Sequence, residues 1–555
     1  MKRLLFLCSC SLLLVSCRTE NSLSADKGND EFQWVDYDET QELKEQAQHE
    51  NERMRFKLIN SKFLDKNEIW ADLEDDLEDF TAQRYEQLKP LIMERSIPEL
   101  QRSIRRGNLS YEELTLFYLY RIRKFESNRE LSLNAIISLN PEVVEKARQF
   151  DRRGISAIAE HSLYGMPILL KDNINTLGMP TTAGAVALAE NITPQDAFIV
   201  KRLKEHGALI LGKVNLSEWA YYFCEGCPLG YSAVGGQTLN PYGRKEFETG
   251  GSSSGSAVAV AANYAAAAVG TETAGSILSP ASANALVGLK PTVGLLSRTG
   301  IVPISGTLDT PGPITRTVIG TAILLEAMTG KDPKDPASVA GQRDYTDLQN
   351  ATLQGKRIGV MNRLLDDSLY AGAVEEMRSQ GAVIIPFDTP EVSLEGFSQL
   401  LSADMKRDLP AYLEQNASEN IAVTSVEDVV TYNLEDTLKY APYGQAIFKE
   451  IVADTTSEEE LVALREKLQE NGRRFFDIPM DAHDLDAVLS MNNYHAAHAA
   501  VAKYPAITVP AGFRASGQPA NVTFIARPFQ EKKLLELAHA LERNYRMRKP
   551  PANYN

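Results

Sequence analysis

Two runs of glycine and serine could bring hydroxyl groups and bare backbone N–H groups together at one point of this chain. The first run is Gly250–Ser256, reading GGSSSGS, and the second is Gly270–Ser276, reading GTETAGS. Residues 257–269 between them are small and mostly apolar, which predicts a buried element. Glycine lets a ligand approach the main chain closely, so this stretch is a candidate site for chemistry on a bound molecule.

Other interpretations of the same stretch stay open at this point. A Gly/Ser-rich segment is often a flexible linker, although linkers are not followed by dense apolar runs. A glycine-rich loop can cradle phosphate at a helix N-terminus, but here no lysine follows the glycines directly. The string Gly251–Gly255 also fits the G-x-S-x-G turn of Ser-His-Asp hydrolases. A histidine whose replacement abolished activity would favour that last alternative.

The composition excludes several classes of protein and of site. The 555 residues carry a formal net charge of -16, which argues against nucleic acid as a partner. Five cysteines are too few for a disulfide scaffold, although Cys224 and Cys227 could close a small disulfide in an oxidising compartment. His483, His495 and His498 lack the spacing of a zinc site, so we expect them to be structural. No metal or cofactor is expected.

The N-terminus predicts export and membrane attachment. Residues 1–17 begin with Lys2 and Arg3 and continue with an apolar stretch that is too short for a stable membrane span, which is typical of a secretory signal. The end of this segment, LVSC, resembles the lipobox of bacterial lipoproteins, in which the cysteine is acylated. The resemblance implies a lipidated Cys17 and an extracytoplasmic protein anchored to a bacterial membrane. Residues 18–40 are polar, so we expect them to form a tether from the membrane surface. An ordinary signal peptide with a stray cysteine is the alternative.

Hydrophobic periodicity predicts helices first and an α/β body afterwards. Residues 41–94 are expected to form a helical N-terminal extension, in which Trp70, Leu73, Leu77 and Phe80 recur at helical spacing. Ser110 should open a helix through a capping box with Glu113. From about residue 163, strands alternate with helices, which implies a buried mixed sheet covered by helices. Residues 389–480 are expected to form a charged helical insert over one end of the sheet. The predicted strands are 166–170, 208–211, 358–361, 382–386, 487–489, 506–509 and 522–525.

Several motifs along residues 95–545 resemble the amidase signature family. They include the two Gly/Ser runs, the strand YGMPILLKDN at 164–173, the segment LGKVNLSEW at 211–219, GLKPTVG at 288–294 and DTPGP at 309–313. Within the family, the pattern is closest to bacterial peptide amidases and related broad amidases. The resemblance implies the amidase signature fold, a large mixed β-sheet sandwiched between helix layers (α/β/α).

The resemblance also implies a Ser-Ser-Lys triad. Ser276 would be the nucleophile, Ser252 the bridging serine and Lys171 the base, while the backbone amides of Thr273, Ala274, Gly275 and Ser276 would form the oxyanion hole. A lysine acts as a base only when neutral, so its pKa must fall from about 10.4 toward 7. Burial on an apolar strand lowers the pKa of a lysine in this way. Amide cleavage would then proceed through an acyl-enzyme on Ser276, without a cofactor.

Two departures from the family pattern bear on the substrate. Ala274 stands where glycine is usual, which is tolerable only if this backbone has no positive φ. Leu278 stands where many members have arginine, a change that we expect to alter substrate contacts and not the reaction. The expected substrate is a small-molecule or peptide amide, and the best candidate is a peptide C-terminal amide. The alternatives are a glutaminase like the glutamine-hydrolysing chain of glutamyl-tRNA amidotransferase and a catalytically inactive, lipid-anchored binding protein.

Overall fold

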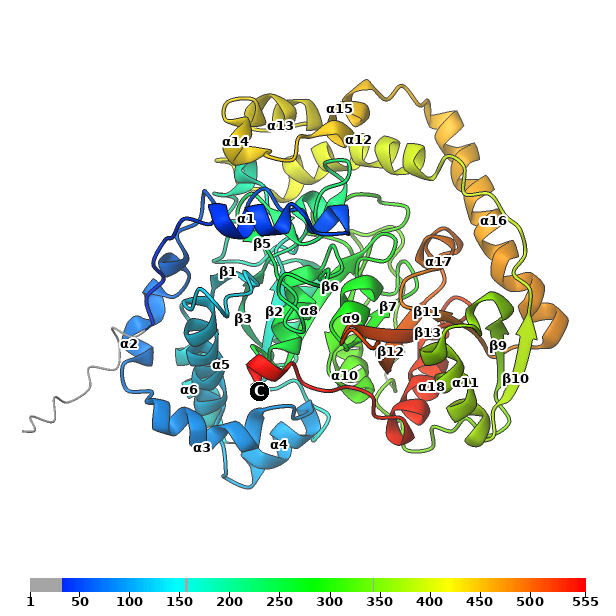
Figure 1. Ribbon diagram of the computed structural model, residues 1–555, viewed down its shortest axis with the longest axis horizontal. Coiled ribbons are helices and arrows are strands. Elements are labelled where there is room, and N and C mark those ends of the chain that lie inside the picture. Colours follow the sequence, from blue (N-terminus) through cyan, green and yellow to red (C-terminus); the bar gives the residue numbers. More distant parts are fainter. Residues whose placement is uncertain (1–31, 155–157, 343) are drawn as a thin grey trace, which may run out of the picture.

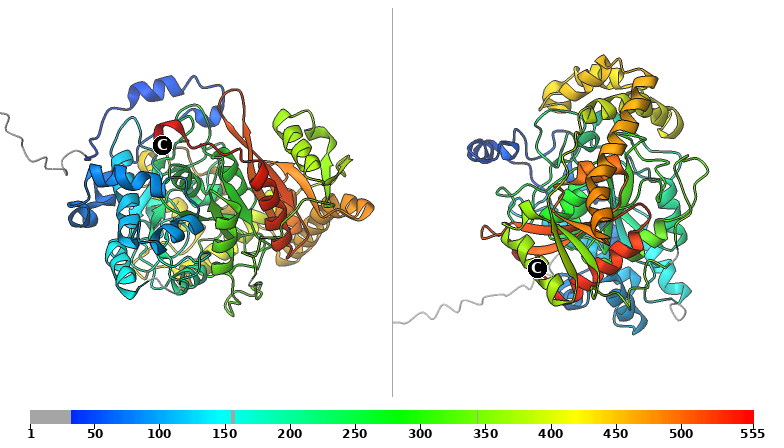
Figure 2. Two further views of the ribbon diagram at one scale, coloured as in Figure 1. Left: turned by 90° about the horizontal axis from the view of Figure 1, so that it is seen from below. Right: turned by 90° about the vertical axis from the view of Figure 1, so that its right-hand side faces the viewer.

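The computed structural model describes residues 32–154, 158–342 and 344–555. Within these ranges, eleven strands form one mixed sheet in the order β1-β3-β2-β6-β8-β7-β12-β13-β11-β9-β10, and helices cover both of its faces (Figures 1 and 2). This arrangement confirms the α/β/α fold. A small hairpin of β4 (Tyr231–Ser232) and β5 (Gly236–Gln237) lies apart from the sheet. The strands of the sheet are β1 (Ile136–Leu139), β2 (Pro167–Lys171), β3 (Leu209–Val214), β6 (Ala267–Glu272), β7 (Val287–Lys290), β8 (Thr310–Thr315), β9 (Arg357–Met361), β10 (Val383–Phe387), β11 (Ala487–Met491), β12 (Ala506–Phe513) and β13 (Pro519–Ile525).

The centre of the sheet combines parallel and antiparallel pairs. Strand β2 runs parallel to both β3 and β6, with Leu170 opposite Val269. Strand β6 is antiparallel to β8, where Gly270 faces Gly312. Every residue of β2 and β6 is buried, as expected for strands covered on both faces. Lys171 and the second Gly/Ser run therefore lie at the ends of two neighbouring buried strands.

The helices of the main body follow the alternation expected from the sequence. Ser110 caps α5 through the expected capping box with Glu113, which confirms that prediction. The buried element predicted between the two Gly/Ser runs begins with α8, a helix whose residues are all buried. The helices of the body are α4 (Ile97–Arg105), α5 (Tyr111–Glu126), α6 (Val143–Arg153), α7 (Phe198–Glu205), α8 (Ser254–Ala261), α9 (Leu278–Ala283), α10 (Val318–Met328), α11 (Ser368–Ser379), α17 (Ala496–Ala502) and α18 (Glu531–Asn544). Its 3-10 turns are η4 (Val186–Leu188), η5 (Glu218–Tyr221), η6 (Asn362–Leu364) and η7 (Ala552–Tyr554).

The N-terminal extension is less regular than its sequence pattern suggested. Trp70 and Leu73 have non-helical backbone angles, so the expected amphipathic helix is divided into short turns. Trp70, Leu73, Leu77 and Phe80 are nevertheless all buried, because these turns still direct them to one side. The prediction was thus right about the buried face, whose members are spread over several short turns. The elements are α1 (Thr40–Gln46), η1 (Glu52–Met54), η2 (Lys66–Ile69), η3 (Ala71–Leu73), α2 (Glu74–Leu77) and α3 (Ala82–Ile92).

The expected tether needs a correction at its C-terminal end. The predicted signal peptide, Cys17 and residues 18–31 lie outside the described residues. From Phe32 onward, however, the chain packs on the body. The indole ring of Trp34 is buried beneath the ammonium group of Lys66, which lies 4.0 Å from the ring centre. Aromatic burial and a cation–π contact hold this segment in place, so residues 32–40 are not a free linker.

A run of helices lies between β10 and β11 and arches over one end of the sheet (Figure 1). Phe397 of α12 and Leu464 of α16 pack on an apolar cluster that also takes in Ala274, the residue two positions before Ser276. This helical insert therefore contributes to the surroundings of the second Gly/Ser run. Its members are α12 (Phe397–Asn416), α13 (Val426–Asn433), α14 (Thr437–Tyr440), α15 (Ala446–Ala453) and α16 (Glu458–His483). Among the described residues, none of the helices has both the length and the apolar character to cross a bilayer.

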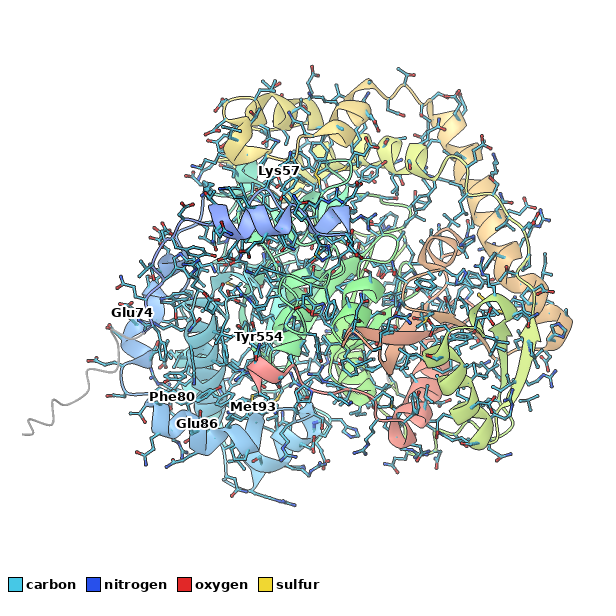
Figure 3. The ribbon with its side chains drawn as sticks, viewed as in Figure 1. Lys57, Glu74, Phe80, Glu86, Met93 and Tyr554 are labelled. Atoms are coloured by element: carbon cyan, nitrogen blue, oxygen red, sulfur yellow. A yellow bond between two sulfur atoms is a disulfide. The ribbon has the colours of Figure 1, made fainter. Side chains whose placement is uncertain are left out.

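Both ends of the described chain are fastened to the body (Figure 3). Near the start, the backbone amide of Lys57 donates to the hydroxyl of Tyr443 in the loop between α14 and α15, at 2.7 Å. At the other end, Tyr554 is buried and its hydroxyl donates to the carbonyl oxygen of Leu131, also at 2.7 Å. The N-terminal extension thus touches the insert directly.

Candidate active site

Lys171 lies at the end of β2 and is completely buried. Its Nζ is 2.8 Å from Oγ of Ser252 and 2.8 Å from Oγ1 of Thr271. Burial lowers the pKa of Lys171 from its usual value near 10.5 to about 7, against the opposing charges of Asp309 and Glu272. A large share of this lysine is therefore neutral at pH 7, as a general base requires.

The two predicted serines lie on neighbouring loops at the ends of buried elements. Ser252 follows a cis peptide bond with Gly251 and lies two residues before the start of α8, whereas Ser276 lies between β6 and α9. The amide of Ser253 donates to the carbonyl oxygen of Ser276 at 3.1 Å, which brings the loops together. Ser252 is completely buried, while Ser276 is partly exposed and accessible to a substrate. Among the described residues, no hydrogen bond joins the two serine hydroxyls directly.

Thr271 is a member of the site that sequence reasoning missed. Besides its contact with Lys171, its Oγ1 accepts a hydrogen bond from the side-chain amide of Asn173 at 3.0 Å. Its backbone amide donates to Oγ of Ser253 at 3.1 Å, and its carbonyl oxygen accepts from the same hydroxyl at 3.0 Å. Thr271 thus fixes the lysine and the first serine loop at once. Its place in the second Gly/Ser run was the only signal in the sequence.

Glu272 organises the turn that carries Ser276, the predicted nucleophile. Its Oε2 accepts hydrogen bonds from the backbone amides of Ile277 at 2.7 Å and Leu278 at 2.9 Å. Burial raises the pKa of Glu272, and the charge of Lys290, followed by the backbone amides of Leu278 and Ile277, counteracts this effect. The amides of Thr273, Ala274, Gly275 and Ser276 stay predicted donors of the oxyanion hole.

The backbone of the same turn explains which side chains it accepts. Gly275 has φ +99°, and a Cβ placed there would lie 3.1 Å from Nδ2 of Asn493, so glycine is required. Ala274, by contrast, has no positive φ, and its methyl group packs on the apolar cluster shared with the helical insert. The alanine at this position is therefore compatible with the fold, which meets the condition set by the sequence.

Asp309 anchors the turn from the opposite side and was also missed. Its carboxylate accepts hydrogen bonds from the hydroxyl of Thr273 and from the backbone amides of Ile304 at 2.8 Å and Ser305 at 2.9 Å. Burial raises the pKa of Asp309 to about 6 despite these donors. Beneath the site, Lys213 and Asp172 form a fully buried ion pair at 3.0 Å. A buried pair of this kind is costly to break, so it stabilises the geometry at the end of β2.

His495 and His498 occupy packed positions, whereas His483, the last residue of α16, is exposed. His495 lies between Ser490, whose Oγ is 2.6 Å from Nδ1, and the guanidinium of Arg363. Burial, followed by the charge of Arg363, lowers the pKa of His495 to about 3. The ring of His498 stacks on Phe475. In the part of the chain that the structure describes, no three His, Cys, Asp or Glu side chains gather where they could hold a metal ion. Cys224 and Cys227 are joined by a disulfide.

Comparisons with known proteins point to one family. The family model described as Amidase matches residues 113–535. A protein named "Probable amidase" from Arabidopsis thaliana is 38% identical over 481 residues, covering 83% of this chain and 92% of its own length. The solved native peptide amidase from Stenotrophomonas maltophilia has a TM-score of 0.77 and 38% identity, and the match covers 83% of this chain and 98% of that chain. A component of glutamyl-tRNA(Gln) amidotransferase from Caldanaerobacter subterraneus subsp. tengcongensis is 30% identical over 491 residues, 82% of this chain and 97% of its own length.

Proposed function

This chain belongs to the amidase signature family and is an amide hydrolase, and we propose that it cleaves linear carboxylic amides to an acid plus ammonia or an amine through an acyl-enzyme on Ser276. The observation that carries the proposal is the 2.8 Å contact between Nζ of Lys171 and Oγ of Ser252, both of which are fully buried. A neutral lysine in hydrogen-bond reach of a hydroxyl can take its proton.

The proton path follows from this contact. Lys171 takes a proton from Ser252, which takes one from Ser276 as the Ser276 oxygen attacks the amide carbonyl. Backbone amides of the nucleophile turn stabilise the negative charge on the carbonyl oxygen, an effect worth a few kcal/mol in enzymes of this type. The proton returns through Ser252 to the leaving nitrogen, and water then hydrolyses the acyl-enzyme by the same path.

The surroundings of Ser276 favour a substrate that is neutral or apolar near the scissile bond. Leu278 is 1% exposed and belongs to a buried apolar cluster, so it offers no charge to a substrate carboxylate. Ala274 packs on the apolar cluster that the helical insert completes. The solved peptide amidase in the comparison is named for peptide amides. We therefore favour a peptide C-terminal amide, followed by small aliphatic or aryl amides.

The experiment combines labelling with product release. Wild-type protein should react with a fluorophosphonate probe and release ammonia from peptide amides, while Ser276→Ala should do neither. Ser279→Ala is the matched control, because Ser279 is also partly exposed and lies three residues along the same segment. Turnover that survives in Ser276→Ala would refute the proposal. Absence of both labelling and turnover in the wild type would favour the inactive binding protein.

A glutaminase is the second candidate, because the amidotransferase component is 30% identical over 491 residues. Glutaminase activity would appear in the same assay as ammonia release from free glutamine. The predicted export argues against this role, since charged tRNA is cytoplasmic. A preference for glutamine over peptide amides would reverse the choice.

Localisation is a separate proposal that rests on residues 1–17. We propose that Cys17 is lipidated and holds the enzyme on the outer side of a bacterial membrane. The Cys224–Cys227 disulfide supports this compartment, because disulfides persist in oxidising surroundings. Labelled palmitate should be incorporated into the wild type and not into Cys17→Ala, and the variant should leave the membrane fraction. Equal labelling of both proteins would contradict the proposal.

A further inference from the structure

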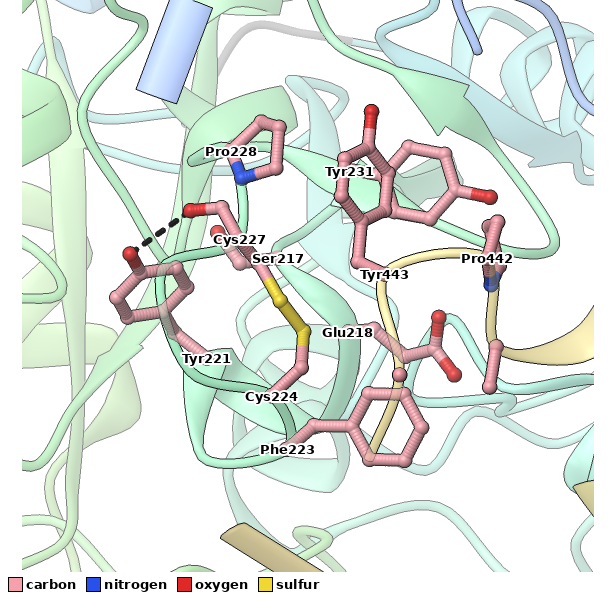
Figure 4. Close-up of a pocket in the computed structure, with 12 residues that line it drawn as sticks. Ser217, Glu218, Tyr221, Phe223, Cys224, Cys227, Pro228, Tyr231, Pro442 and Tyr443 are labelled. Carbon is pink, nitrogen blue, oxygen red and sulfur yellow. Dashed lines mark hydrogen bonds between the residues drawn. A yellow bond between two sulfur atoms is a disulfide. The ribbon is translucent and has the colours of Figure 1, made fainter. Parts of the chain in front are cut away.

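A small cavity lies beside the first serine loop, where residues 217–231 of the main body meet residues 441–444 of the helical insert (Figure 4). Its free space is about 10 Å³, which is room for about one molecule the size of water. Aromatic side chains and the Cys224–Cys227 disulfide form most of the lining, together with one acidic residue, Glu218. The aromatic members are Tyr221, Phe223, Tyr231 and Tyr443.

Glu218 has an incomplete set of hydrogen bonds. The residue is 5% exposed, and its Oε2 accepts a hydrogen bond from the amide of Ala233 at 2.9 Å. Its Oε1 is buried and, among the described residues, has no hydrogen-bond partner. Figure 4 shows Glu218 among the residues that line the cavity. Because buried polar atoms are nearly always paired, this oxygen calls for a partner, and the cavity that Glu218 lines has room for one.

The charge of the lining indicates what that partner is. Lysine, arginine and histidine are missing from the described residues that line the cavity, so the carboxyl group has no counter-charge there. Burial raises the pKa of Glu218 well above its usual value, and only the amide of Ala233 opposes this effect. The nearby ammonium group of Lys57 is engaged with the carbonyl oxygen of Pro442 at 2.9 Å. Aromatic faces attract cations, so they complement a carboxylate in binding one.

We propose that this cavity binds a single ammonium ion. The ion would come from the ammonia that amide hydrolysis releases. This source rests on the proposed function, whereas the site itself does not. Ammonia would take the proton of the Glu218 carboxyl group, which leaves an ammonium ion paired with a carboxylate and needs no other reactant. An organic amine is too large for the cavity. Sodium and potassium ions need several oxygen ligands, while ammonium donates hydrogen bonds and contacts aromatic faces.

The position of the cavity couples it to the catalytic loop. Ser217 precedes Glu218 and lines the cavity, and its backbone amide donates to the carbonyl oxygen of Ser252 at 3.0 Å. A bound ion would therefore stabilise the folded protein and support the segment that holds the bridging serine. Binding to the folded state alone raises the unfolding temperature as the ligand concentration increases.

The test compares thermal unfolding of the full chain in ammonium, sodium, potassium and tetramethylammonium chloride at equal ionic strength. Ammonium should raise the Tm of the wild type above its value in the other three salts. This difference should be lost in Glu218→Gln and kept in Glu225→Gln, because Glu225 is an exposed glutamate in the same disulfide loop. Tyr231→Leu keeps the carboxyl group but removes an aromatic face, so its response should be reduced.

Three results would overturn the proposal: no ammonium-specific rise in the wild type, the same rise in Glu218→Gln, or an equal rise in potassium chloride. If Glu218→Gln does not fold, the proposal is overturned by an ammonium-specific rise in Tm that is as large in Tyr231→Leu as in the wild type. Hydrolysis of an anilide, which releases no ammonia, is measured in parallel. If the wild type does not hydrolyse the anilide but keeps its ammonium-specific rise in Tm, the result counts against the proposed function and not against the ion site.

Discussion

Replacement of Lys171 by methionine should abolish activity and yet stabilise the protein. The side chain is completely buried, and methionine fills a similar volume without a charge. In the wild type, burial makes the protonated lysine unfavourable, which is what lowers its pKa. A buried catalytic base of this kind lowers the stability of the fold. Its removal should therefore abolish turnover and raise the free energy of unfolding.

The magnitude follows from the pKa of the folded state. A fall from 10.5 to about 7 corresponds to about 5 kcal/mol of lost stability at low pH. Methionine also leaves the oxygens of Ser252 and Thr271 without their lysine partner, at a cost of about 1–3 kcal/mol. We therefore expect a net gain of about 2–4 kcal/mol at pH 6.

The sign of the pH dependence is fixed by the same pKa. Because the folded-state pKa lies below the unfolded value, the penalty of the wild type is complete below pH 7. It decreases as the pH rises from 7 to 10.5 and is absent above that range. The stability advantage of Lys171→Met should decrease over the same interval.

Urea unfolding at pH 6, 8 and 10, together with amide turnover, measures these effects. Lys213→Met is the matched control, because Lys213 is equally buried but is paired with Asp172 at 3.0 Å. Its removal leaves a buried carboxylate unpaired and should destabilise the protein by about 3–5 kcal/mol. The reasoning is refuted if Lys171→Met is less stable than the wild type at pH 6, or if its advantage does not depend on pH.

Three further outcomes are expected. The kcat/KM of the wild type should rise with pH and level off above an inflection near 7, where Lys171 loses its proton; a flat profile between pH 5 and 8 would contradict this role. Asp309→Asn should lower kcat, because the hydroxyl of Thr273 loses a charged partner, and should move that inflection to lower pH, because Asp309 raises the pKa of Lys171; an unmoved inflection would argue against this effect. Trp34→Ala should release the N-terminal segment to limited proteolysis while amide turnover continues, whereas unchanged protease resistance would show that other contacts hold the segment.

The contrast between predicted and observed elements has a physical reason. Residues 163–525 alternate between strand and helix patterns, and their apolar runs are buried in the sheet as expected, because burial on both faces demands continuous apolar sequence. Residues 41–94 also show apolar spacing, but this spacing selects a buried side and does not impose a continuous helix. Tertiary packing there accommodates non-helical angles at Trp70 and Leu73.

The amino-acid sequence by itself determined the family resemblance and the α/β/α class, and it predicted Lys171, Ser252 and Ser276 as the triad, because short motifs and periodicity are local properties of a chain. Only the tertiary structure revealed Thr271 beside the lysine, Asp309 beside Thr273 and the unpaired oxygen of Glu218. Asp309 lies 36 residues from Thr273, and Thr271 lies 100 residues from Lys171. Contacts between such distant segments depend on strand order and loop packing, which local sequence patterns do not encode.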